Sequence, residues 1–102
     1  MQSPLPHPAR DEMRIEAVLS ALADPIRLRI VRALADSAEG ISCGLLDLGV
    51  SASTLTHHVR TLREAGVVRV RPRGTSRISS LRRDDLDALY PGLLDGVLAA
   101  PR

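Results

Sequence analysis

The sequence predicts a mainly α-helical domain with one short β-hairpin. Apolar residues recur at spacings of three and four over most of the chain, valine alternates with arginine only near residues 67–71, and turn-forming proline and glycine follow at once. A chain of 102 residues suits one domain with a single modest core. We expect a flexible, proline-rich N-terminal arm at residues 1–9, one domain at residues 10–98 and a tail at residues 99–102.

Composition narrows the classes of function. Hydrophobic residues make up 44% of the chain and charged residues 25%, with no apolar run of the length that spans a membrane. Tyr90 is the only aromatic residue, so the stacking platforms that bind single-stranded nucleic acid are missing. Cys43 is the only cysteine, which excludes an intramolecular disulfide and a four-thiolate metal site. With no secretory signal at the N-terminus, we expect a cytoplasmic protein.

Two helices are expected before residue 40. The first runs from Arg10 to Ala23, and Asp24 followed by Pro25 marks the start of the second, because aspartate caps free N–H groups and proline suits the first helical position. The second helix is expected to run to about Ser37. The residues expected to face inward are Ile15, Val18, Leu19 and Leu22 in the first helix, and Ile26, Ile30, Val31 and Leu34 in the second.

A short helix and a longer one are expected next. Ser42 can cap a helix from Cys43 to Leu48, and Gly49 can take the left-handed conformation of a helix end. The longer helix runs from Ser51 to Ala65 and stops at Gly66. Its narrow apolar face carries Leu55, Val59 and Leu62, while its polar face carries Ser53, His57, Arg60, Thr61 and Glu64.

A short helix, a tight turn and a second helix with one apolar seam form a helix-turn-helix pattern. In such motifs the second helix enters the major groove of double-stranded DNA. Its polar side chains can donate to phosphates and base edges, and an arginine can pair with a guanine through two hydrogen bonds. The residues predicted to contact DNA from this helix are Ser51, Ser53, Thr54, Thr56, His57 and Arg60.

The residues after Gly66 predict a hairpin rich in arginine. Val67–Arg71 alternates apolar and basic residues, Pro72–Thr75 turns the chain, and Ser76–Leu81 returns. Beside a reading helix, such a hairpin is expected to contact phosphates as a wing, whereas alone it could be a charged edge that discourages strand aggregation. The residues predicted to contact DNA from the hairpin are Arg69, Arg71, Arg73 and Arg77.

The last segment predicts a helix to about Tyr90 and a second short helix beyond it. Pro91–Gly92 interrupts the helical pattern between them. Apolar residues of this segment supply material for a contact between subunits, and they are Leu86, Leu89, Leu93, Leu94, Val97 and Leu98.

Two stretches resemble the ArsR/SmtB family of winged-helix repressors. Residues 20–35, SALADPIRLRIVRALA, are similar to that family's second helix, and residues 49–68, GVSASTLTHHVRTLREAGVV, are similar to its reading helix. The resemblance extends from about Ile15 to Leu89. It implies a winged helix-turn-helix with a two-stranded β-wing, and a homodimer packed through the first and last helices. It also implies that the protein represses transcription by binding a palindromic operator, and that an inducer relieves this repression.

The sequence departs from the metal-sensing members of that family. Their thiolate site needs a Cys-x-Cys motif, but here Cys43 stands alone, and their other site takes Asp and His from the last helix, which here has no histidine. Any metal would therefore be an ion such as nickel or zinc held by nitrogen and oxygen. The candidate ligands are His7, Asp84, Asp85 and Asp87, and a nickel- or zinc-responsive regulator remains an alternative.

Two other classes of function compete with a DNA-binding regulator. Some winged helices bind proteins instead of DNA, but that function favours an apolar exposed face on residues 51–65, which this sequence lacks. An enzyme is disfavoured because the chain has no nucleophile elbow, no Gly-rich phosphate loop and no paired carboxylate with a histidine at helical spacing.

Overall fold

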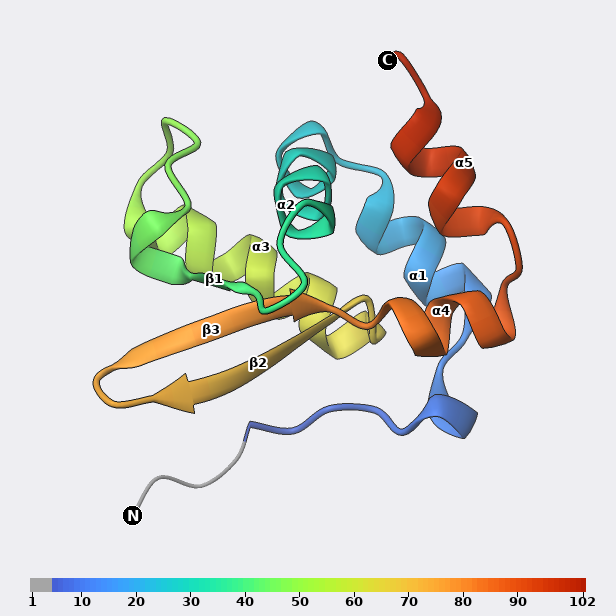
Figure 1. The fold of residues 1–102 in the computed structure, drawn as a ribbon, viewed down its shortest axis with the longest axis horizontal. Coiled ribbons are helices and arrows are strands. Elements are labelled where there is room, and N and C mark those ends of the chain that lie inside the picture. Colours follow the sequence, from blue (N-terminus) through green and yellow to red (C-terminus); the bar gives the residue numbers. More distant parts are fainter. Residues whose placement is uncertain (1–4) are drawn as a thin grey trace.

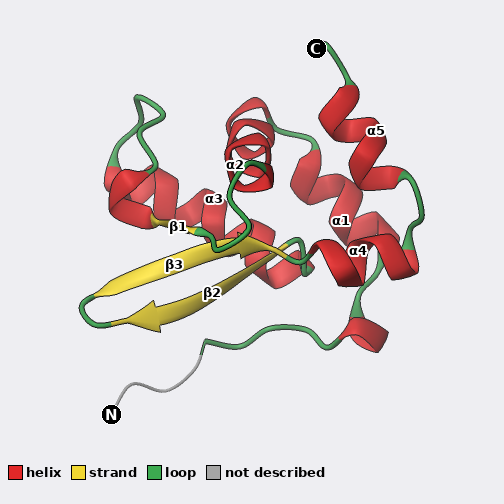
Figure 2. Ribbon diagram, viewed as in Figure 1, coloured by secondary structure: helices red, strands yellow, loops and turns green. Residues whose placement is uncertain are grey.

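A computed structural model describes residues 5–102 as five α-helices and a small antiparallel sheet (Figures 1 and 2). The first helices gather over one face of the sheet, the last two lie at its end, and the β-hairpin projects from them (Figure 1). This arrangement is a winged helix-turn-helix, as the sequence predicts. In chain order the elements are η1 (Arg10–Glu12), α1 (Ile15–Leu22), α2 (Pro25–Ala35), β1 (Ile41–Ser42), η2 (Cys43–Leu45), α3 (Ala52–Ala65), β2 (Val68–Arg73), β3 (Ser76–Leu81), α4 (Arg83–Leu89) and α5 (Leu93–Ala99).

The first predicted helix is broken into two pieces, which corrects its expected span of 10–23. A single 3-10 turn, η1, ends at Glu12, whose carboxylate accepts a hydrogen bond from the Ala9 N–H at 2.7 Å. Met13 and Arg14 are then extended, and α1 begins at residue 15. The break places the Met13 side chain against Gly66 at the end of α3, a contact between distant residues that no local pattern reveals.

Helix α1 buries fewer of its apolar residues than predicted. Val18 and Leu22 are buried, together with Ala21. Ile15 and Leu19 were expected to face inward, but they are 40% and 50% exposed. The side of α1 that carries them is therefore partly open in the described chain.

Helix α2 begins as the sequence predicts. The Asp24 carboxylate accepts hydrogen bonds from the N–H groups of Ile26 and Arg27 at 2.8 and 3.1 Å, and Pro25 occupies the first helical position. These backbone hydrogen bonds lower the pKa of Asp24, so the cap is charged at neutral pH. Three of the four residues expected to face inward are buried (Ile30, Val31 and Leu34), and Ile26 is half-buried.

The predicted helix at residues 43–48 is wrong. Residues 41 and 42 form the short strand β1, η2 is only one 3-10 turn, and the Ser42 side chain caps nothing. Strand β1 pairs with β3, with Ile41 opposite Ser79 and Ser42 opposite Ile78. Gly40 permits this approach, because a Cβ there would lie 2.6 Å from the Ser79 carbonyl oxygen. Pairing with a strand almost forty residues away takes the place of the local helix.

The sheet has three strands in the order β1-β3-β2, where the sequence predicts only two. The hairpin pairs Val68 with Leu81 at its base and Arg73 with Ser76 at its tip, so Gly74 and Thr75 form a two-residue loop in place of the expected four-residue turn. Pro72 lies within β2, which is an edge strand and tolerates the missing N–H.

The two C-terminal helices agree with the predicted break. Helix α4 ends at Leu89, and α5 begins after Gly92, whose φ of +84° is the left-handed conformation that glycine adopts without strain. Both helices lie at the end of the molecule opposite the hairpin tip (Figure 1). Leu86 and Leu94 join them to the core.

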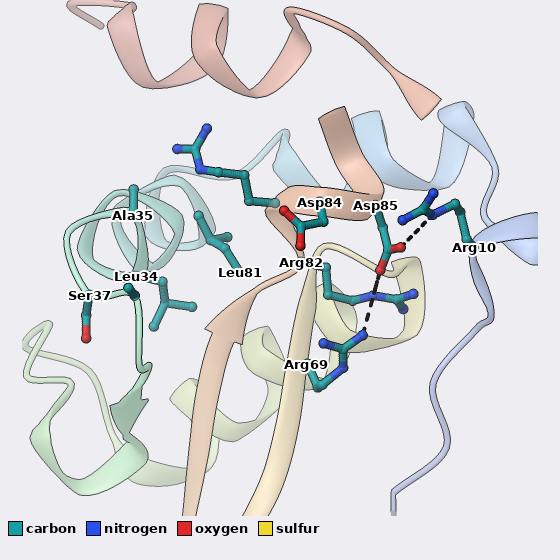
Figure 3. A pocket seen from close by; sticks show the side chains of 11 residues that line it. Arg10, Leu34, Ala35, Ser37, Arg69, Leu81, Arg82, Asp84 and Asp85 are labelled. Carbon is teal, nitrogen blue, oxygen red and sulfur yellow. Dashed lines mark hydrogen bonds and ion pairs between the residues drawn. The ribbon is translucent and has the colours of Figure 1, made fainter. Parts of the chain in front are cut away.

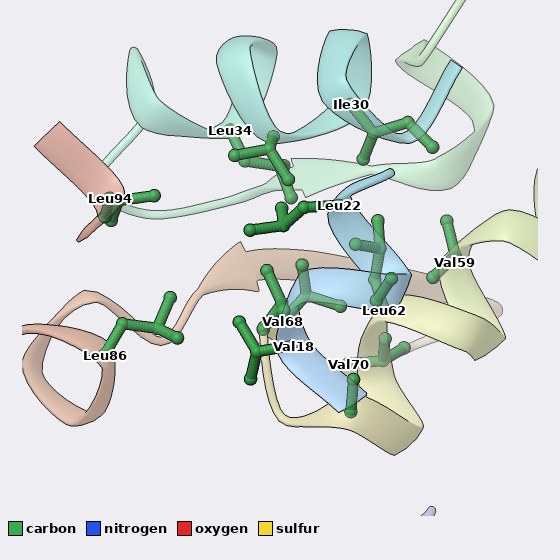
Figure 4. Packing of buried hydrophobic residues seen from close by; sticks show 14 of the residues in the cluster. Val18, Leu22, Ile30, Leu34, Val59, Leu62, Val68, Val70, Leu86 and Leu94 are labelled. Atoms are coloured by element: carbon green, nitrogen blue, oxygen red, sulfur yellow. The ribbon is translucent and has the colours of Figure 1, made fainter. Parts of the chain in front are cut away.

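One aliphatic core connects the five α-helices and the sheet (Figure 4). Valine, leucine, isoleucine and alanine side chains from α1, α2, α3 and β2 meet between the helices and the sheet. Leu62 of α3 and Val68 of β2 are fully buried, so the reading helix and the base of the hairpin share one packed interior.

The described part of the N-terminal arm is attached to the domain. Residues 5–9 of the predicted arm run beside β2 (Figure 1). The Arg63 guanidinium donates to the Pro6 carbonyl at 2.9 Å, the Arg82 guanidinium donates to the Pro8 carbonyl at 2.7 Å, and the Val70 N–H donates to His7 Nε2 at 2.9 Å. Residues 1–4 of the predicted arm lie outside the described residues.

Candidate nucleic-acid interface

Helix α3 presents a polar face to the outside. Ser51 caps its start, with Oγ accepting from the Thr54 N–H at 3.2 Å, and Gly66 ends it in the left-handed conformation. Leu55, Val59 and Leu62 hold the apolar seam in the core. The other side leaves the predicted reading residues Ser53, Thr54, Thr56, His57 and Arg60 exposed. A buried seam thus fixes which side chains project outward.

Some of the predicted reading residues also stabilise the helix. The Ser51 hydroxyl donates to Thr54 Oγ1 at 2.9 Å and lies 3.2 Å from Ser53 Oγ. These hydroxyls therefore form one linked group at the start of α3. Thr56, His57 and Arg60 make no side-chain hydrogen bond with residues 5–102, so their donors are available to a partner.

The adjacent histidines of α3 have different surroundings. His57 is exposed, whereas His58 is half-buried and its Nδ1 lies 3.1 Å from a guanidinium nitrogen of Arg27 on α2. The sequence predicts this difference, because successive residues diverge on a helix. The two rings are tilted by 57° with centroids 5.7 Å apart. Of the pair, only His57 points outward from the polar face.

The four predicted wing arginines do not form one set. Arg69, Arg71 and Arg73 share one face of the hairpin, whereas Arg77 is paired with Pro72 and projects from the other face. An Arg69 guanidinium nitrogen lies 3.7 Å from Asp85 Oδ2, and the Arg71 guanidinium donates to the Glu39 carbonyl at 3.3 Å. Arg73 and Arg77 have no such partner in the described chain, and both are exposed near the hairpin tip.

A groove of about 590 Å³ separates α3 from the hairpin. Its lining brings together Thr56 and Arg60 of α3 with Arg77 of β3, three of the residues predicted to contact DNA. Arg63 and Leu5 also line it, as do Ser42, Cys43, Gly44, Val59, Val70, Thr75 and Ser76. Three arginines and no carboxylate give this groove a positive potential suited to an anion.

Arg63 is the residue of this groove that the sequence analysis missed. It is only 9% exposed, and its guanidinium is held by the Pro6 carbonyl. Arg63 follows Leu62 and comes four residues after Val59, so helical periodicity places it close to the apolar seam. This position is the signal in the sequence that could have indicated a buried arginine. No local pattern in the sequence indicates that Arg63 binds the N-terminal segment.

The predicted metal ligands are not brought together. Both ring nitrogens of His7 are occupied, Nδ1 by the Leu5 carbonyl at 2.8 Å and Nε2 by the Val70 N–H. Asp85 pairs with arginines, Asp87 lies 3.9 Å from a nitrogen of Arg83, and Asp84 is exposed. Within residues 5–102, no group of three or more His, Cys, Asp or Glu side chains could hold a metal ion.

Cys43 is half-buried beside the sheet, with Sγ 3.8 Å from Ser79 Oγ.

No helix in the described part of the chain is long and apolar enough to cross a bilayer.

Comparison with known proteins identifies the family. A model described as a helix-turn-helix domain matches residues 22–71, from the end of α1 into β2. The uncharacterized HTH-type transcriptional regulator YceK of Bacillus subtilis (strain 168) is 34% identical over 87 residues, which cover 83% of this chain and 86% of that protein. An uncharacterized HTH-type transcriptional regulator of Methanocaldococcus jannaschii is 36% identical over 59 residues, covering 57% of this chain and 66% of that protein.

These relatives are named for regulation of transcription, and they agree with the exclusion of an enzyme on sequence grounds. With a winged helix-turn-helix in the structure and a relative matched over most of both chains, this chain belongs to the helix-turn-helix transcriptional regulators.

Proposed function

We propose that this protein is a homodimeric repressor of the ArsR/SmtB type that binds a palindromic DNA operator. The observation that carries the proposal is the groove between α3 and the hairpin, which is lined by Arg60, Arg63 and Arg77 and by no carboxylate. Such a groove suits the phosphate backbone at the edge of a major groove occupied by α3.

In this proposal α3 reads the DNA sequence. Thr56, His57 and Arg60 project from its polar face and have donors free for base edges and phosphates. Arg60 would discriminate most strongly, since two hydrogen bonds to guanine are worth about 1–3 kcal/mol against another base. Ser51, Ser53 and Thr54 lie at the start of the same helix, where their hydroxyls and the helix N-terminus suit a phosphate.

The hairpin arginines would supply affinity that does not depend on sequence. Arg73 and Arg77 are exposed at the tip, so each can neutralise a phosphate and release counterions. Arg69 and Arg71 are tied to Asp85 and to the Glu39 carbonyl, so we assign them a smaller share of the DNA contact.

Dimerisation is proposed through the end of the molecule opposite the hairpin tip. Ile15 and Leu19 of α1 and Leu89 of α4 are exposed there by 40%, 50% and 37%. Apolar side chains on neighbouring helices are typical of a surface that is covered in an assembly. A two-fold axis at this end would present two α3 helices to successive major grooves about 34–36 Å apart. As a DNA-binding regulator, the protein would act in the cytoplasm.

Selection of DNA by the purified protein tests this proposal. From a pool of random duplexes we expect enrichment of an imperfect palindrome whose half-sites are one helical turn apart. Enrichment of no sequence, with only weak salt-sensitive binding, would reject a specific regulator and favour a protein-interaction module.

The sequence prediction of a nickel- or zinc-responsive regulator can be tested in the same selection. Repeating it with each ion, and with the His7→Ala variant, would show whether either metal changes DNA binding. A metal effect that survives His7→Ala would reject His7 as a ligand.

A further inference from the structure

A second hollow, of about 420 Å³, lies at the base of the hairpin (Figure 3). It is bounded by the end of α2, the base of β2, the start of α4 and η1, and it shares no lining residue with the groove beside α3. Of its lining residues, only Arg69 takes part in the proposed DNA contact, with the smaller share assigned above. We refer to it as the arginine pocket, and its argument rests on Arg10, Arg69 and Arg82.

Three guanidinium groups converge on one carboxylate in the arginine pocket. Arg10 Nε lies 2.7 Å from Asp85 Oδ1, while Arg82 Nε and an Arg69 guanidinium nitrogen lie 2.9 and 3.7 Å from Asp85 Oδ2 (Figure 3). Hydrogen bonds from Arg10 and Arg82 keep the pKa of Asp85 below its ordinary value, so the carboxylate is ionised. Arg69 and Arg82 are brought together by the pairing of β2 with β3, whereas Arg10 comes from η1, a segment far away in the sequence.

One carboxylate leaves positive charge and many donors unused. Each guanidinium has five N–H donors, and Asp85 offers two oxygens to three of these groups. Asp84 also lines the pocket, so these three arginines and two aspartates carry one positive charge in excess. The side chains of Arg10 and Arg69 are about half exposed, which leaves their remaining N–H groups open to the pocket.

The remaining lining residues indicate what kind of ligand the pocket could hold. Arg83 also borders the pocket, but its guanidinium is shared with Asp95 at 3.2 Å and Asp87 at 3.9 Å. The opposite wall is apolar, formed by Leu34, Ala35, Ala38 and Leu81. A pocket of a few hundred Å³ with an apolar wall and converging charged groups is typical of a site for a small molecule.

We propose that the arginine pocket binds a small organic oxyanion, a carboxylate or a phosphate ester carried on a compact apolar body. The oxyanion is held by free N–H groups of Arg10 and Arg69, because guanidinium groups pair with both kinds of oxyanion through two parallel hydrogen bonds. The apolar body lies against Ala35 and Leu81, which are half-buried and line the pocket. Arg82 is nearly buried and bonded to Asp85 and to the Pro8 carbonyl, so it supports the site without needing to touch the ligand.

Binding of simple probes to the full chain, without DNA, tests this site. Phenyl phosphate and benzoate carry the two oxyanions, and benzyl alcohol is the neutral control of similar shape. Each is titrated while the backbone amide signals of residues 81–85 are followed by NMR. We expect saturable binding of at least one anion, with shifts in these signals and none from benzyl alcohol, and the stronger of the two anions identifies the oxyanion class.

Two arginine variants make the test specific. Arg69→Gln is expected to weaken binding about tenfold or more, since it removes charge-assisted hydrogen bonds to the anion. Arg73→Gln is the matched control, because Arg73 lies on the same strand and the same face as Arg69 but does not line the pocket. The affinity of this variant for the anion should equal that of the unchanged protein. Equal weakening in both variants, equal binding of benzyl alcohol, or no saturable binding would overturn the proposal. The experiment contains no DNA, so its failure would reject the anion site without rejecting the proposed repressor function.

Discussion

His7 accepts a hydrogen bond from the backbone N–H of Val70, with 2.9 Å between Nε2 and the nitrogen, while its Nδ1 lies 2.8 Å from the Leu5 carbonyl oxygen. These two contacts determine the tautomer: Nδ1 carries the proton and Nε2 is the acceptor. A protonated imidazole has no acceptor, so the contact with Val70 requires a neutral ring. Of the three hydrogen bonds that hold the N-terminal segment on the domain, the one to the edge strand therefore depends on the charge of His7.

The first prediction concerns pH. Burial lowers the pKa of His7 from its ordinary value of 6.5. The hydrogen bond to the Leu5 carbonyl raises this pKa, whereas the positive charges of Arg63, Arg82 and Arg69 lower it further. The unfolded chain then takes up a proton at higher pH than the folded one, so the stabilisation by His7 is full above pH 6.5 and is lost as the pH falls toward the lowered pKa. Urea unfolding at about pH 7.5 and about pH 5.5 should show this decrease in stability.

His7→Gln is the variant that isolates this effect. A glutamine can accept from Val70 through its side-chain oxygen but does not titrate, so its stability should vary less between the two pH values. His57→Gln, at an exposed position of α3, should keep the pH dependence of the unchanged protein. The same pH dependence in His7→Gln would contradict the prediction.

The second prediction concerns the contact between Gly66 and Met13. Gly66→Ala places a side chain at a φ of +91° and a Cβ 2.8 Å from Met13 Cγ, whereas Gly49→Ala meets a φ of +73° in open space. Both changes should cost about 1–2 kcal/mol of unfolding free energy for the left-handed backbone. Gly66→Ala should cost about 1 kcal/mol more because of overpacking. Urea unfolding should show that this extra cost of Gly66→Ala is absent when both forms carry Met13→Ala, a comparison that cancels the core packing lost with Met13 itself.

A third prediction tests the reading helix. His57→Ala combined with Arg60→Ala should abolish the preference for the selected operator over scrambled DNA, because it removes two free donor groups from the polar face of α3. The circular dichroism spectrum should not change, since both residues are exposed. Arg14→Ala, also at an exposed arginine but outside the groove, should bind as the unchanged protein does. An unaltered preference in the double variant would reject α3 as the reading helix.

The fourth prediction tests the wing. Arg73→Ala and Arg77→Ala should each weaken binding to all sequences alike, since each removes one phosphate contact. Plots of log affinity against log salt concentration, measured by fluorescence anisotropy, should become less steep by about 0.9 for each phosphate that is no longer neutralised. If the slope stays the same, the hairpin tip does not contact DNA.

The fifth prediction tests the dimer. Leu19→Glu places a charge on the exposed apolar side of α1 and should convert a dimer into a monomer in sedimentation equilibrium. Leu45→Glu is the control, because Leu45 is more exposed, at 78%, but lies on η2, far from the proposed interface in sequence. A monomeric unchanged protein, or a Leu19→Glu variant that remains dimeric, would reject this interface.

Elements with local signals were predicted well from the sequence. The Asp24-Pro25 start of α2, the Ser51 cap and Gly66 stop of α3, the alternating hairpin and the break before α5 all agree with the structure. Their cause lies within a few residues of each boundary.

The errors have a different cause. The pairing of Ile41 with Ser79, the packing of Met13 on Gly66 and the docking of His7 on Val70 join residues more than thirty positions apart. Local patterns carry no information about such contacts. The candidate groove was predicted in part for the same reason: Thr56 and Arg60 follow from helical periodicity, whereas Leu5 enters only through the folding of the N-terminal segment.

The short strand β1 supports only the inner part of the hairpin. Its pairing with β3 ends at Ser42 and Ile78, so the hairpin is supported on that side only up to Ile78. Beyond this point the residues from Pro72 to Arg77 are paired only within the hairpin. Because Arg73 and Arg77 lie in this outer part, we expect most of the conformational entropy lost on contact with a phosphate to come from the hairpin tip and little from the base of the sheet.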